Sequence, residues 1–235
     1  NVALAALRLR AGGLVALPTE TVYGLGASAR DVAAVERVFR LKGRPRSHPL
    51  IVHIASAAQL SDWGLGGGGR AAVLAEAFWP GPLTLVLPRA PGVPDAVTGG
   101  QPTVALRVPA HPVAQALLAA FGDGVAAPSA NRFGRISPTT AAHAASEFAD
   151  EEVVVLDGGP CEVGLESTIV DLTGSAPRLL RPGGVAVAEV EGALGERVEL
   201  PRGVRADLPR VPGSLRSHYA PDAPVTLLGR DELDA

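Results

Sequence analysis

Residues 18–25 read Pro18-Thr19-Glu20-Thr21-Val22-Tyr23-Gly24-Leu25, directly after the apolar run Leu14–Leu17. The apolar run predicts a short buried strand, so hydroxyl groups and a carboxylate gather where that strand ends. Polar groups packed at the end of an apolar strand cost desolvation free energy unless they bind a partner. The stretch is therefore the first candidate binding site. A capped strand-to-helix turn is the alternative that this segment alone leaves open.

Composition limits the class of protein. The 235 residues suffice for one or two domains, and the net charge of -3 does not favour a general nucleic-acid coat. A single cysteine, Cys161, cannot form an internal disulfide framework, which favours a reducing, cytoplasmic location. No apolar run approaches the roughly 18 residues of a membrane span, so we expect no membrane contact.

Helical and strand patterns alternate along the chain and predict an α/β fold with a mixed sheet. A helix after Asp31 is predicted by apolar residues at spacings of three and four, and another is predicted over 139–148, with Ser137 as its N-cap. Further helices are predicted at 2–10, 70–78 and 113–121, and strands at 14–17, 50–54, 83–87, 104–108, 125–127, 153–156, 168–172 and 178–180.

The character of the sequence changes near residue 200. Five prolines and little periodicity between residues 200 and 224 predict a linker or a wrapping arm. Residues 225–228 then resemble a new strand. That strand either starts a second domain or forms a last edge strand of the first.

Four further polar clusters lie at predicted element ends. Lys42-Gly43-Arg44-Pro45-Arg46 would suit an anion, although cations at a helix C-terminus are the alternative. The others are Pro128–Asn131 with the residues to Ser137, Gly164–Thr168, and Arg181–Gly184. Strand ends are where α/β folds bind ligands, so we expect these clusters to share one site. His53, within a predicted strand, fits a satisfied core residue better than a catalyst.

These clusters, in this order, resemble the YrdC-like family of threonylcarbamoyl-AMP synthases. The resemblance implies a twisted mixed α/β sheet flanked by helices around a large, concave, positively lined cleft. It covers residues 1–200 as a catalytic domain. It also implies a linker or lid arm over 201–224 and the start of a truncated Rossmann-like domain over 225–235. The matching motifs are PTETVYGLG (18–26), KGRP (42–45), HPLIVHI (48–54), WPGPLT (79–84), ALRVP (105–109), APSAN (127–131), SPT (137–139), ESTIVD (166–171) and RPG (181–183), with PGSLRSHYAP (212–221) in the linker.

The activity implied by this resemblance is an ATP-dependent nucleotidyltransferase reaction. L-threonine and bicarbonate form a carbamate that attacks the α-phosphate of ATP, which yields threonylcarbamoyl-AMP and pyrophosphate. A separate transferase would then use the product to modify tRNA to threonylcarbamoyladenosine. Mg²⁺ would accompany the ATP. A weak RNA contact is also implied, and no nucleophilic residue is needed, because positioning and charge neutralisation suffice.

The resemblance also implies roles for single residues. Lys42 and Arg44 would stabilise phosphate charge, and Tyr219 would fold over the nucleotide. His48 stands where asparagine is expected in many relatives, so its contribution would depend on its protonation. The threonine-binding residues would be Thr21, His53, Arg107, Ala127 and Ser167. The ATP-binding residues would be Lys42, Arg44, His48, Thr103, Ser129, Asn131, Ser137, Arg181 and Tyr219.

Two other functions remain to be weighed at this point. An RNA-binding module could use the concave basic face without chemistry, although the near-neutral charge and few aromatic residues weigh against it. The carbamoyl-transfer domain of hydrogenase-maturation proteins shares the fold. Those proteins carry cysteine-rich zinc modules, and a single cysteine argues against them.

Overall fold

The computed structural model describes residues 1–200 and 208–212. Tyr219 and most of the predicted linker therefore lie outside the described residues, as does the start of the predicted second domain, and that division stays a prediction. Within the described part, the helices are α1 (Val2–Arg10), α2 (Val32–Lys42), α3 (Arg70–Phe78), α4 (Asp95–Thr98), α5 (Pro112–Phe121), α6 (Ala141–Glu147), α7 (Val187–Leu194) and the 3₁₀ helix η1 (Ala57–Asp62).

One nine-stranded mixed sheet organises the described chain, in the order β7-β1-β2-β6-β3-β5-β4-β8-β9. Three neighbouring pairs are parallel (β1/β7, β3/β5 and β4/β8), and the other pairs are antiparallel. This confirms the predicted mixed α/β fold. The strands are β1 (Leu14–Leu17), β2 (Gly24–Ser28), β3 (Ile51–His53), β4 (Leu83–Pro88), β5 (Thr103–Arg107), β6 (Val125–Ala126), β7 (Val153–Val155), β8 (Thr168–Asp171) and β9 (Arg178–Arg181).

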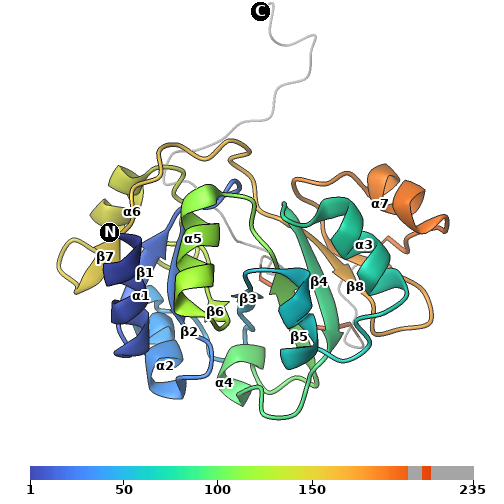
Figure 1. Cartoon of the computed structure of the whole chain (residues 1–235), viewed down its shortest axis with the longest axis horizontal. Coiled ribbons are helices and arrows are strands. Elements are labelled where there is room, and N and C mark those ends of the chain that lie inside the picture. The colour runs from blue at the N-terminus through green and yellow to red at the C-terminus, as the bar shows by residue number, and fades with distance from the viewer. Residues whose placement is uncertain (201–207, 213–235) are drawn as a thin grey trace, which may run out of the picture.

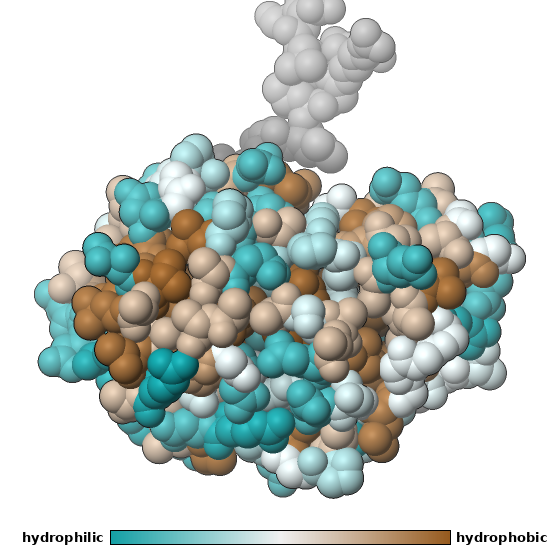
Figure 2. Space-filling model, viewed as in Figure 1, coloured by the Kyte–Doolittle hydropathy of each residue, from teal (hydrophilic) through white to brown (hydrophobic). Residues whose placement is uncertain are grey.

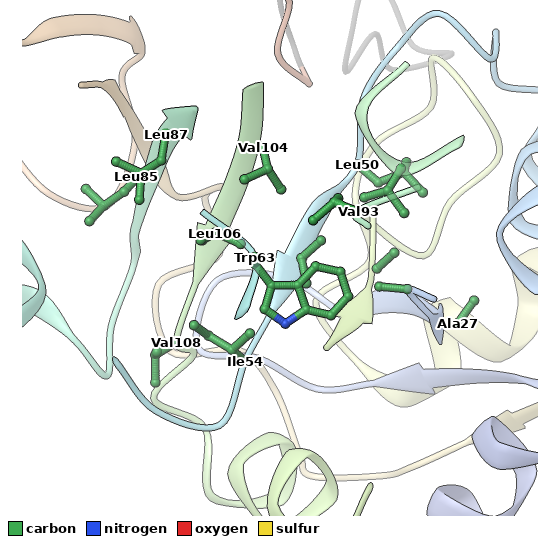
Figure 3. Packing of buried hydrophobic residues seen from close by; sticks show 14 of the residues in the cluster. Ala27, Leu50, Ile54, Trp63, Leu85, Leu87, Val93, Val104, Leu106 and Val108 are labelled. Carbon is green, nitrogen blue, oxygen red and sulfur yellow. The ribbon is translucent and has the colours of Figure 1, made fainter. Parts of the chain in front are cut away.

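Alternating residues of the strands divide between the two faces of the sheet. In β1, Leu14 and Ala16 belong to the large core that includes the buried face of α2. Val15 and Leu17 pack instead with α1 and α5. Figure 3 shows the large core around Trp63, which is fully buried beside residues of β5. The helices α3 and α7 also contribute to that core and lie side by side at the right of Figure 1.

The helices α1 and α5 cover only one end of their face of the sheet. They leave the rest of that face, over β3, β5, β4 and β8, uncovered. There a small apolar cluster of Ile51, Val86, Ala105 and Ile169 is covered by Val211. Residues 208–212 are fastened across this face. The side chain of Gln101 exchanges two hydrogen bonds with the backbone of Arg210, and Arg181 donates to the Pro212 carbonyl at 3.1 Å. The open part of this sheet face provides the floor of the site.

Most predicted elements are confirmed within a residue or two at each end. Other outcomes differ. The helices α4, η1 and α7 were not predicted. The strand β2 was not predicted, so the Pro18–Tyr23 stretch joins two antiparallel strands and does not lead into a helix. The predicted N-cap Ser137 is wrong, because α6 begins later and Thr140 accepts the capping hydrogen bond from His143 N.

The surface in Figure 2 carries hydrophobic side chains at the left, over α1. Leu4 and Leu7 of that helix are 60% and 59% exposed. Scattered exposed leucines are normal on globular domains, so these two residues need no special explanation. Among the described helices, none is long and apolar enough to cross a membrane.

Candidate functional site

A cleft opens on the uncovered face of the sheet. The β3 and β5 side chains that reach it follow the strand alternation, so His53 and Arg107 share the face of Ile51 and Ala105. The loops after β1 and after β6 and the loop before β8 contribute the remaining sides. The lining residues are Thr19, Thr21, Val22, Gly24, Arg44, Ile51, His53, Arg107, Ala127, Pro128, Ser129, Glu166, Ser167, Arg181 and Pro212.

The structure brings together all five residues that the resemblance assigns to threonine. They are Thr21, His53, Arg107, Ala127 and Ser167, from five separate segments of the chain. Three of the residues assigned to ATP, Arg44, Ser129 and Arg181, line the same cleft. Three arginines face one carboxylate, Glu166, in this lining, which makes the cleft suitable for anions.

The other described residues assigned to ATP are not among those that line this cleft, and Tyr219 lies outside the described residues. Thr103 lines a second groove with Gln101, Leu208 and Pro209. On β5, Thr103, Ala105 and Arg107 share one face, and Val211 covers Ala105. Residues 208–212 therefore separate the Thr103 groove from the main cleft. His48 packs edge-on against Phe133, with ring centroids 5.9 Å apart, and Asn131 is buried.

Two backbone carbonyls accept hydrogen bonds from Lys42, and its contact with phosphate stays a prediction. Its side chain is 3% exposed, and its ammonium donates to the carbonyls of Ser129, at 2.5 Å, and Asn131. Burial, and then the nearby Arg44 cation, lower the pKa of Lys42 well below its ordinary value. Lys42 thus fixes the loop that carries Ser129, and it does not line the cleft.

A directed chain of hydrogen bonds fixes the Thr21 hydroxyl. Thr19 Oγ1 donates to the Val22 carbonyl at 2.6 Å, so Thr21 must donate in its 2.9 Å contact with Thr19. Arg107 Nη1 donates to Thr21 Oγ1 at 2.9 Å. The Thr21 hydroxyl has used its hydrogen and one lone pair, so it offers an acceptor to a ligand in the cleft.

Arg107 is held on three sides. Its Nη2 donates to Glu20 Oε1 at 2.7 Å, and its Nε donates to the Gly81 carbonyl at 3.2 Å. With the bond to Thr21, three of its five N–H groups have these partners, which leaves one on each terminal nitrogen. Two N–H groups from different nitrogens can still bind a carboxylate. The sequence offered no role for Glu20, and the structure makes it the counter-ion of Arg107.

His53 is neutral in the cleft. It is 4% exposed, and burial, followed by the Arg107 cation, lowers its pKa to about 3. A neutral ring beside three arginines adds no positive charge to the cleft. His48 also has a lowered pKa, through burial and the neighbouring Arg44 and Arg210. Its predicted charge-dependent contact with phosphate would therefore require a pH below its ordinary titration range.

Ser167 and Ser137 each contact a second polar group. Ser167 Oγ lies 2.7 Å from Thr84 Oγ1 and accepts from Arg181 Nη2 at 3.0 Å. Ser137, which does not cap α6, donates to Glu166 Oε1 at 2.6 Å. This bond joins the loop after β6 to the loop before β8 at the edge of the cleft.

Sequence reasoning missed two buried residues that support the site, Glu20 and Thr84. Glu20 stood inside the quoted stretch, and its unusual position before a second threonine was the only signal. Thr84 ends the WPGPLT motif (79–84), but the sequence analysis assigned it no role because it lies within an apolar strand. In residues 1–200 and 208–212, no group of three His, Cys, Asp or Glu side chains could hold a metal ion. The predicted Mg²⁺ stays a prediction.

Comparison with known proteins identifies the family. Residues 8–183 match the Sua5/YciO/YrdC model, described as "Telomere recombination". The chain is 48% identical to the threonylcarbamoyl-AMP synthase of Pyrococcus abyssi and 44% identical to that of Bacillus subtilis. Both alignments cover 97% of this chain, and 68% and 66% of the respective relatives.

A solved structure of P. abyssi Sua5 complexed with L-threonine is also similar. It superposes with a TM-score of 0.89 at 48% identity, over 94% of this chain and 66% of that one. The chain therefore spans about two thirds of the length of these relatives. On the strength of the family match, the identity and the shared fold, this chain belongs to the Sua5/YciO/YrdC family.

Proposed function

We propose that the protein is an L-threonylcarbamoyl-AMP synthase, an ATP-dependent nucleotidyltransferase that acts in tRNA modification. The observation that carries the proposal is the gathering of Thr21, His53, Arg107, Ala127 and Ser167 in one arginine-lined cleft. The identity of 44–48% to relatives named threonylcarbamoyl-AMP synthase supports it. So does the similarity to a Sua5 structure complexed with L-threonine.

The amino acid would bind on the sheet floor. The two remaining N–H groups of Arg107 suit its carboxylate, and the acceptor lone pair of Thr21 suits a neighbouring N–H or O–H group. Because His53 is neutral, it places no positive charge beside the amino group of the bound amino acid. This combination of donor and acceptor groups is complementary to an α-amino acid.

The reaction would proceed in two steps. The amino group of threonine first combines with bicarbonate to give a carbamate, with loss of water. A carbamate oxygen then attacks the α-phosphorus of ATP, and the bond to the pyrophosphate leaving group breaks. Arg44 and Arg181 would neutralise the negative charges that must approach each other, so positioning and electrostatics would supply the catalysis.

ATP, bicarbonate and Mg²⁺ are part of this proposal. Of the described residues, Glu166 alone contributes a carboxylate to the cleft lining, so Mg²⁺ would be held mainly by phosphate oxygens. It would neutralise phosphate charge when bound. A downstream transferase would consume the mixed anhydride product, which is reactive toward amines.

The test is pyrophosphate release from ATP with the chain as it stands. We expect release only when L-threonine and bicarbonate are both present, and formation of an adduct with the mass of threonylcarbamoyl-AMP. L-serine and an amino-acid-free sample serve as controls. Equal release in these controls would contradict the threonine assignment, and no release in any sample would contradict the activity of this chain.

A further inference from the structure

Thr84 lies in β4 beneath the cleft and does not line it. Its side chain is fully buried, and its hydroxyl oxygen lies 2.7 Å from the hydroxyl oxygen of Ser167. Ser167 is buried as well and lines the cleft. Either hydroxyl could be the donor in this contact, and the surroundings of each group decide between the two directions.

Suppose first that Ser167 donates to Thr84. The Thr84 hydrogen then has no acceptor among the described residues, although its side chain is out of contact with solvent. A buried donor without an acceptor is among the costliest polar defects in a protein interior, at about 1–3 kcal/mol.

Suppose instead that Thr84 donates to Ser167. Ser167 Oγ then accepts from both Thr84 and Arg181 Nη2, which fills its two lone pairs. Its own hydrogen is left to point into the cleft. In this direction the hydroxyl hydrogen that lacks an acceptor belongs to Ser167, which lines the cleft and can donate to a ligand there, and not to Thr84, which does not line it.

We propose that Thr84 is a positioning residue that makes Ser167 a hydrogen-bond donor toward an acceptor oxygen of the bound amino acid. The inference rests on the proposed function for the identity of that ligand. Two hydroxyls of the cleft then have opposite hydrogen-bonding roles toward the ligand. Thr21 accepts, because its own hydrogen is donated to Thr19. Ser167 donates, because Thr84 and Arg181 occupy its two lone pairs.

The test is calorimetric titration of L-threonine, and separately of ATP, into the wild-type chain and Thr84→Val. Valine has the shape of threonine without the hydroxyl. We expect threonine to bind about three- to tenfold more weakly, the range of one lost hydrogen bond, with ATP affinity unchanged. Thr84→Ser, which keeps the hydroxyl, should restore threonine affinity. Thr84→Ala is a second hydroxyl-free variant in case Thr84→Val does not fold. Unchanged threonine affinity in a folded hydroxyl-free variant would overturn the proposal.

Thr168→Val is the matched control. Thr168 lies next to Ser167 and is equally buried, but its hydroxyl bonds Val185 O and N and not the cleft. Loss of the Thr168 hydroxyl should lower the melting temperature and leave the affinity for threonine unchanged. Equal weakening in both variants would show that strand stability, and not the Ser167 polarity, governs binding.

A double-mutant cycle completes the test. If Thr84 acts only through Ser167, the double variant Thr84→Val/Ser167→Ala should bind threonine as weakly as Ser167→Ala alone. Additive losses would contradict the proposal. These readouts separate it from the proposed function: wild type that binds threonine without forming the adenylate contradicts the function alone, and no threonine binding by wild type overturns both.

Discussion

Glu20 and Arg107 form an ion pair inside the molecule, with 2.7 Å between Oε1 and Nη2 and side-chain exposures of 6% and 4%. The second carboxylate oxygen of Glu20 accepts from Ala110 N at 3.0 Å. The carboxylate of Glu20, in the loop after β1, therefore binds both Arg107 at the end of β5 and Ala110 in the turn that follows. It also compensates the charge of an arginine that burial would otherwise destabilise, since burial lowers the pKa of Arg107 and Glu20 raises it.

Glu20→Ala should lower the free energy of unfolding by about 3–5 kcal/mol, because it leaves a buried guanidinium without its counter-ion. Urea denaturation of the ligand-free chain measures this. Glu152→Ala is the control, since it breaks the ion pair with Arg8, in which Glu152 is 84% exposed. That change should cost less than about 1 kcal/mol. Similar losses in the two variants would show that burial does not determine the strength of the Glu20–Arg107 pair.

Lys42→Met keeps most of the apolar stem and removes the ammonium group. The carbonyls of Ser129 and Asn131 then lose a buried donor, so we expect a loss of about 1–3 kcal/mol of stability, measured by urea denaturation. Arg40→Met, an exposed change on the same helix, is the control and should stay within about 0.5 kcal/mol of wild type. Unchanged stability with a selective loss of ATP affinity would instead support the phosphate contact predicted from the sequence.

His53 should make the fold sensitive to acid. Its pKa is about 3 in the folded chain and about 6.5 when unfolded, so the unfolded state binds more protons between these values. The contribution of His53 to the free energy of unfolding is complete above pH 6.5. It is lost as the pH falls toward 3, by up to roughly 4 kcal/mol.

Unfolding free energies of His53→Gln, measured between pH 7 and pH 4, should therefore fall less steeply than those of wild type. His143→Gln, at an exposed histidine of α6, should keep the wild-type slope. A wild-type slope in His53→Gln would mean that other groups cause the acid sensitivity.

Gly26 explains why β2 was not predicted. The sequence Gly-Leu-Gly-Ala-Ser lacks the β-branched residues typical of strands. A Cβ at Gly26 would lie 2.8 Å from Val125 Cγ1 and 2.9 Å from Leu17 Cδ2. The glycine is required by side chains of neighbouring strands, and this information is absent from the local pattern.

Gly26→Ala should accordingly destabilise the chain by about 1–3 kcal/mol through overpacking, which thermal unfolding would detect. Gly68→Ala is the matched control, because a Cβ there meets open space. The prediction fails if both changes have the same small effect.

The same distinction between local and distant information applies to the site. Apolar runs and helix spacing predicted most elements, because those signals lie within a few residues of each other. Strand ends located the cleft-lining residues Thr21, Arg107 and Ser167 for the same reason. Thr84 could not be predicted, since its partner Ser167 is 83 positions away along the chain. Ser137 was assigned a local capping role because its partner Glu166 is 29 positions away.

Glu166 provides the last prediction, because it is the carboxylate in a cleft lined by three arginines. It accepts from Ser137 at 2.6 Å, and Ser137 is predicted to contact ATP. Glu166→Gln removes a negative charge from the proposed triphosphate site and weakens the hold on Ser137. By calorimetry, we expect the variant to bind ATP without Mg²⁺ about three- to tenfold more tightly than wild type does. With Mg²⁺ present the increase in ATP affinity should be smaller, since the metal neutralises phosphate charge. Glu162→Gln, at an exposed position of the same loop, should leave both affinities unchanged. Weaker binding of Mg²⁺-ATP to Glu166→Gln would contradict the repulsion argument and assign the carboxylate to the metal.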